Sequence, residues 1–160
     1  MTTTKPARSL LSAILFTGLL AGLLDGLAAI IQYTINGGKE PARIFKYIAS
    51  AVFGKEKAYN SGNSMVVWGV LFHLGIAMLF TAFFFLIYPK IRGLATNRVI
   101  TAIVYGLFVW AIMNLLVVPM SQIHPAPFVL KKAAIAAGIL IVCIGIPVSF
   151  MANKYYLYRK

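Results

Sequence analysis

The sequence predicts an all-α integral membrane protein: a bundle of four transmembrane helices with one short interfacial amphipathic helix. Composition is the first reason, because 61% of the 160 residues are hydrophobic and only 11% are charged, whereas about a quarter of a soluble domain is charged. The second reason is that four apolar runs are each long enough to cross a hydrocarbon core of about 30 Å. Backbone groups find no water inside a bilayer, so each run must be helical. Residues 1–160 are expected to form one membrane domain.

Prolines and aromatic residues mark the ends of the predicted spans, which cover about residues 10–35, 65–88, 99–118 and 133–152. Pro119 is expected to end the third span, because proline lacks the N–H that a helix needs. Pro147 lies inside the fourth apolar run and is therefore expected to bend that helix rather than end it. Trp68 and Tyr88 stand near the two ends of the second span, where aromatic rings meet lipid headgroups.

A short amphipathic pattern over about residues 41–53 separates the first two spans. Pro41 stands in its first turn and Gly54 follows its last, which is the usual punctuation of a helix. Its apolar residues recur at helical spacing: Ile44, Phe45, Ile48, Val52 and Phe53. The segment is too short to cross a bilayer, so we expect it to lie flat on the membrane surface. The polar residues 55–63 are expected to form a flexible connection.

The charge is strongly basic, with 15 Lys and Arg residues against 3 Asp and Glu. The basic residues stand at the ends of the apolar runs, where they meet anionic lipid headgroups. The expected partner is therefore the lipid bilayer, with anionic lipids, and nucleic acid is not expected. Eight basic residues fall on the side of the two termini and seven on the other side. Lys5 and Arg8 directly flank the first span, which favours cytoplasmic termini.

Three glycines in the first span, Gly18, Gly22 and Gly26, follow one another at intervals of four. They share one helix face and let another helix approach closely. We expect the partner to be another span of the same chain, with a homo-oligomer as the alternative. The fourth span carries a comparable small-residue surface at Ala133, Ala134, Ala137 and Gly138.

Asp25 is the only acidic residue in any predicted span. A carboxylate there is costly, so it should face protein or water, form a pair, or be neutral. Successive spans alternate in direction, and this places Asp25, His73 and Asn114 in the same half of the bilayer. Gln32 extends their polar character toward the same surface. These four residues are the predicted intramembrane polar cluster. It is either a proton-handling site, because histidine changes charge near neutrality, or a network that only fixes helix packing.

The sequence predicts neither an enzyme nor a cofactor. It contains no nucleotide-binding, hydrolase or metalloprotease motif, and three acidic residues are too few for a carboxylate metal centre. His124 stands in a loop without neighbouring metal ligands, so no metal site is expected. Cys143 is the only cysteine and is expected to be a small buried side chain. A membrane enzyme that uses Asp25 and His73 as an acid–base pair would need a lipid-derived substrate, and no motif indicates one.

Several segments resemble a bacterial family of multi-pass inner-membrane proteins typified by YagU. The similar segments are residues 18–22 (GLLAG), the stretch around His73, residues 88–91 (YPKI), residues 107–109 (LFV) and the prolines Pro119, Pro125 and Pro127. They extend over spans one to three, and the Pro-Lys-Ile sequence is the most specific of them. The resemblance implies a bacterial inner membrane and no mechanism. Trp110 stands where the pattern has a second histidine, and Asp25 has no counterpart in it.

From these features we expect a non-enzymatic multi-pass inner-membrane protein that moves or senses a small species such as protons through the polar cluster. The alternative is a structural or accessory membrane protein without transport activity. Transport through so small a bundle would favour a homo-oligomer.

Overall fold

The computed structural model describes residues 9–91, 97–123 and 127–157, and all regular secondary structure within them is helical, as predicted. Four helical spans are long and apolar enough to cross a membrane. The first two are α1 (Leu10–Ile35) and α4 (Ser64–Ile91). The third consists of α5 (Arg98–Ile112), η1 (Met113–Val117) and α6 (Val118–Met120), and the fourth of α7 (Leu130–Leu140), η2 (Ile141–Gly145) and α8 (Ile146–Leu157). Two short helices, α2 (Ala42–Phe53) and α3 (Lys55–Asn60), connect α1 to α4.

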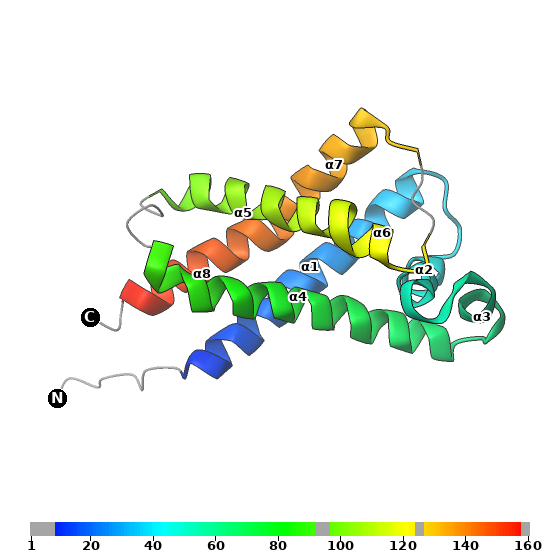
Figure 1. Cartoon of the computed structure of the whole chain (residues 1–160), viewed down its shortest axis with the longest axis horizontal. Coiled ribbons are helices and arrows are strands. Elements are labelled where there is room, and N and C mark those ends of the chain that lie inside the picture. Colours follow the sequence, from blue (N-terminus) through cyan, green and yellow to red (C-terminus); the bar gives the residue numbers. More distant parts are fainter. Residues whose placement is uncertain (1–8, 92–96, 124–126, 158–160) are drawn as a thin grey trace.

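The spans alternate in direction, so α1 begins and α8 ends at the same end of the bundle (Figure 1). Helix α8 packs against α1, α4 and α5, and the main core lies around it. This core contains Phe84, Phe85, Tyr88, Tyr105, Val109, Ile144 and Val148. The prediction that Tyr88 marks the membrane interface is wrong. Its ring is 1% exposed and its hydroxyl accepts a hydrogen bond from Asn153 (2.7 Å), because α8 covers this end of α4.

Glycines set the distance between α5 and the fourth span. A Cβ atom on Gly106 would lie 2.5 Å from the Cα atom of Ile141, and one on Gly145 would overlap the carbonyl oxygen of Ala102. By contrast, a Cβ atom on Gly138 would meet nothing within 4 Å. The close contact therefore lies at Gly106 and Gly145 rather than at the predicted small-residue surface of residues 133–138.

Two spans contain a π-helical segment, and each segment ends two residues before a proline. η1 precedes Pro119 and η2 precedes Pro147. A proline has no N–H to donate and its ring collides with the carbonyl group four residues earlier. A π turn relieves that collision because its hydrogen bonds reach five residues back. The third span ends at Met120, one residue after Pro119 and close to the predicted end. The fourth span continues past Pro147, as predicted.

The predicted amphipathic helix is present as α2, and it is seated on the first turns of α4. Figure 1 shows α2 nearly end-on while α4 runs across the page, so α2 lies across the end of the bundle. The ring of Phe53 stands 5.9 Å from those of Trp68 and Phe72, and a side chain at Gly69 would collide with the backbone of Phe45. Ala49 and Ser50 are buried against the rest of the protein, while Val52 is 53% exposed.

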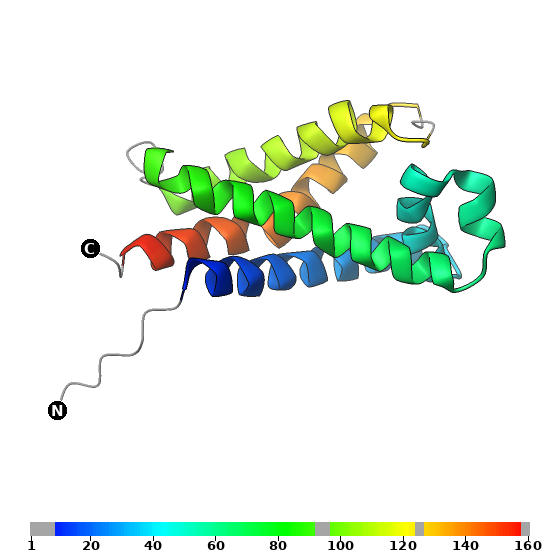
Figure 2. The same cartoon turned by 60° about the horizontal axis from the view of Figure 1, so that its bottom comes forward.

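Residues 55–63 are not the flexible connection that was predicted, because Lys55–Asn60 form the helix α3. Gly54, at a φ of 79°, allows the sharp change of direction between α2 and α3. Ala58 is fully buried beside Ala49 and Met65. One buried alanine in a polar stretch is too weak a pattern to indicate a helix. Figure 2 shows α2 and α3 together at the end opposite the start of α1.

The chain after α6 also holds α2 in place. The backbone N–H of Gln122 donates to the carbonyl oxygen of Ala51 (3.1 Å), and its side-chain amide donates to that of Val52 (2.6 Å). The last carbonyl groups of a helix have no partner within the helix. Gln122 therefore caps α2 and connects it to the third span.

Candidate intramembrane site

The site lies where α1 crosses α4, and the three predicted glycines form the crossing. A Cβ atom on Gly18 would lie 2.6 Å from the Sδ atom of Met78, and one on Gly22 would lie 3.1 Å from the Cβ atom of Ala77. Further along, a Cβ atom on Gly26 would come within 3.2 Å of Nε2 of His73. The glycine face is thus occupied by α4 of the same chain and is not free for a second copy of the protein.

His73 connects the two helices directly. Its Nε2 atom lies 2.9 Å from the carbonyl oxygen of Gly22. A carbonyl oxygen only accepts, so Nε2 must carry the proton and donate it. This hydrogen bond exists only because Gly22 and Gly26 bring the backbone of α1 close to the imidazole. The ring of Phe45, from α2, meets the imidazole edge to face at 6.3 Å, so α2 covers the site from the loop end.

Asp25 lies beside His73 without a direct hydrogen bond. Its Oδ2 atom is 3.9 Å from Nε2, which is too far for a hydrogen bond but close enough for a strong charge interaction. The side chains of His73 and Asp25 are 14% and 18% exposed. Asp25 is about ten residues from the end of α1, or about 15 Å at the rise of a helix. The pair therefore lies deep in the apolar part of the bundle.

Cys143 lies in the fourth span, in a segment that packs against α1. It is buried on η2, which packs against α1, the helix that carries Asp25. The predicted role as a small buried side chain fits this burial.

The other two predicted cluster residues are placed differently. Asn114, on η1, donates its side-chain amide to the carbonyl oxygen of Trp110 in its own span (2.9 Å). Gln32 follows Asp25 by seven residues, which places it on the same face of α1 about 10 Å nearer the α2 end. The structure therefore brings Asp25 and His73 together, leaves Asn114 bonded within its own helix, and puts Gln32 between the pair and the loop surface. His124 lies outside the described residues.

The fold and this site define the class: a multi-pass membrane protein with an aspartate and a histidine side by side inside its helix bundle. Comparison with protein-family models, with curated proteins and with solved structures finds no match for the chain. The resemblance to the YagU-like family therefore stays a prediction, and the function must be argued from the site.

Proposed function

We propose that this protein moves or senses protons through the Asp25–His73 pair, and that it is not an enzyme. One observation carries the proposal: an acid and a histidine lie 3.9 Å apart in the apolar interior of the bundle. A lone charge is costly there. The pair is therefore most stable when both groups are charged or both are neutral, which couples the protonation of one side chain to that of the other.

His73 can change its charge without releasing α1. The proton on Nε2 stays on the carbonyl oxygen of Gly22, while Nδ1 makes no hydrogen bond in the described part of the chain and can gain or lose the second proton. The imidazole therefore changes charge at a fixed position beside Asp25. Gln32, on the same face of α1, supports a polar route from the pair toward the α2 end of the bundle.

A second reading is a structural or accessory membrane protein, and a specific observation favours it. The hydrogen bond from Nε2 of His73 to Gly22 joins α1 to α4 (2.9 Å). Hydrogen bonds between membrane helices contribute about 0.6 kcal/mol on average. In this reading His73 holds two helices together and its second nitrogen has no role.

The two readings are separated by His73→Gln, because a glutamine amide can still donate to the Gly22 carbonyl but cannot carry a proton at neutral pH. Wild type, His73→Gln and Asp25→Asn would be reconstituted into liposomes that contain a trapped pH dye. We expect proton flux in wild type and its loss in both variants, with unchanged helicity showing that both remain folded in the liposomes.

Asn114→Ala is the matched control, since Asn114 is also polar and intramembrane but bonds within its own helix. Its flux should equal that of wild type. Flux that persists in His73→Gln, or wild-type flux no greater than that of empty liposomes, would favour the structural reading.

We also propose that the membrane is the bacterial inner membrane, with both termini in the cytoplasm. Supporting this are the YagU-like segments and the two basic residues directly before the first span, Lys5 and Arg8. A fluorescent protein and alkaline phosphatase would each be fused to the C-terminus in bacteria. Bright fluorescence with inactive phosphatase is expected, and the reverse pattern would place the termini outside.

A further inference from the structure

An apolar cleft lies between α4 and α5. It is in the half of the bundle that holds the start of α1 and the end of α8. The cleft has a volume of about 430 Å³. Its floor is made by Phe84 and Tyr105, which are 1% and 5% exposed and whose ring centroids are 4.4 Å apart. The hydroxyl group of Tyr105 donates to the carbonyl oxygen of Phe80 (2.5 Å). The floor is therefore a packed and fixed surface.

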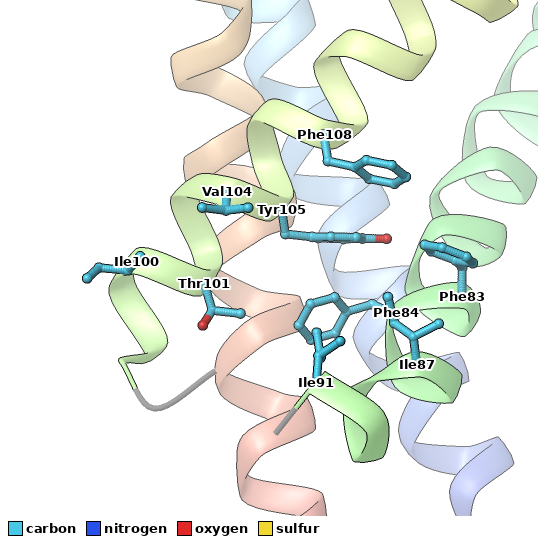
Figure 3. A pocket seen from close by; sticks show the side chains of 9 residues that line it. All are labelled: Phe83, Phe84, Ile87, Ile91, Ile100, Thr101, Val104, Tyr105 and Phe108. Carbon is cyan, nitrogen blue, oxygen red and sulfur yellow. The ribbon is translucent and has the colours of Figure 1, made fainter. Parts of the chain in front are cut away.

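The cleft is open toward the lipid and closed toward the bilayer centre. Phe83 and Phe108 stack across it at 5.8 Å and form its inner end, as Figure 3 shows. Val104, on the α5 wall, is 60% exposed. From Phe83 to the end of α4 the cleft extends for about 12 Å along the helix, compared with about 15 Å for one leaflet of the hydrocarbon core. Its shape and lining suit an acyl chain that enters from the side.

Each wall carries a basic residue at the membrane-surface end. Lys90 follows Phe83 by seven residues and lies on the same face of α4. Arg98 precedes Tyr105 by seven residues and lies on the same face of α5. Both side chains are exposed. The guanidinium group of Arg98 rests over the ring of Phe150, on α8, at 5.8 Å, so Arg98 stands beside the cleft. Two cations therefore flank the membrane-surface end of the cleft, at the level where the headgroup of a lipid would lie.

We infer that this cleft binds one anionic phospholipid, with an acyl chain on the Phe84–Tyr105 floor and the phosphate-bearing headgroup between Lys90 and Arg98. Apolar contact alone would accept any lipid. The pair of cations selects an anionic one, because a basic residue near the surface changes the binding of an anionic lipid about fivefold. The site lies in the other half of the bilayer from Asp25 and His73, so the inference does not depend on the proposed proton function.

The test is native mass spectrometry of the full chain in detergent with equal amounts of phosphatidylglycerol and phosphatidylcholine. Wild type should retain phosphatidylglycerol in preference to phosphatidylcholine. Val104→Trp, which fills the cleft, should lose most of this retained lipid. The double variant Lys90→Gln/Arg98→Gln leaves the cleft open, so it should still retain lipid but with the preference reduced by about tenfold or more.

Two matched variants control for general effects. Leu19→Trp adds the same ring at a lipid-facing position of α1 in the same half of the bilayer, where Leu19 is 44% exposed. Lys131→Gln/Lys132→Gln removes two exposed charges at the opposite end. Both should retain lipid as wild type does.

Equal retention of the two lipids by wild type, or a preference that survives in Lys90→Gln/Arg98→Gln, would overturn the inference. The inference would also be overturned if Val104→Trp kept its lipid but changed from dimer to monomer. The cleft of wild type would then be filled by a second copy of the protein. If Val104→Trp does not fold, the charge variant alone decides.

Discussion

Replacing Gly106 or Gly145 by alanine is expected to destabilise the bundle strongly, whereas the same change at Gly75 or Gly138 is expected to be harmless. A Cβ atom on Gly106 would meet the Cα atom of Ile141 at 2.5 Å, and one on Gly145 would overlap the carbonyl oxygen of Ala102. Both obstacles are backbone atoms, so no side chain can rotate out of the way and the helices must separate. Overpacking of this kind costs about 1–3 kcal/mol.

The two control glycines make the comparison specific. A Cβ atom on Gly75 or Gly138 would meet nothing within 4 Å, and alanine is the better helix former by up to about 1 kcal/mol. Those variants should be as stable as wild type or slightly more so. The single cysteine provides the measurement, because Cys143 is buried and reacts with a maleimide dye only when the bundle opens. Dye labelling during heating in nanodiscs should begin at lower temperature for Gly106→Ala and Gly145→Ala. Equal unfolding temperatures for all four variants would contradict the prediction.

Removing His73 is expected to destabilise the protein in a way that a second change at Asp25 partly reverses. His73→Leu removes the hydrogen bond to Gly22 and leaves the Asp25 carboxyl group without its charge partner. Breaking a buried pair by removing one partner costs about 3 kcal/mol or more. His73→Leu/Asp25→Asn removes the unpaired charge as well, and should recover the part of the loss that is not due to the hydrogen bond.

A double-mutant cycle measures this coupling. The four proteins are wild type, His73→Leu, Asp25→Asn and the double variant, each unfolded in the same nanodiscs. Coupled neighbours typically differ from additivity by about 0.5–3 kcal/mol, and a value in this range is expected for Asp25 and His73. The matched control is the cycle of Asp25→Asn with Asn114→Ala, which should be additive because Asn114 bonds to Trp110. Additivity in the first cycle would mean that the two side chains do not interact across the 3.9 Å between them.

The sequence predicts the architecture well because membrane insertion depends on properties that add up along the chain. Hydropathy and length locate four spans, and the observed ends of the spans lie within a few residues of the predicted ones. Alternating helix direction places Asp25 and His73 at the same depth. The amphipathic spacing of residues 41–53 locates α2. The errors occur where structure depends on one or two residues, such as Ala58 in α3 or the π segments before Pro119 and Pro147.

By itself, then, the sequence determines that this is a four-span membrane protein, which of its residues are polar inside the membrane, and at what depth they lie. The tertiary structure decides which faces of the helices meet, since that depends on the rotation of each helix about its axis. Gly22 and Gly26 let the backbone of α1 approach His73. This contact fixes the rotation of α1 about its axis, and that rotation places Asp25 beside the imidazole. At the other end, large rings hold α4 and α5 apart and leave a cleft between them. Hydropathy has nearly the same value on every side of such apolar helices, so only the fit of large and small side chains sets these rotations.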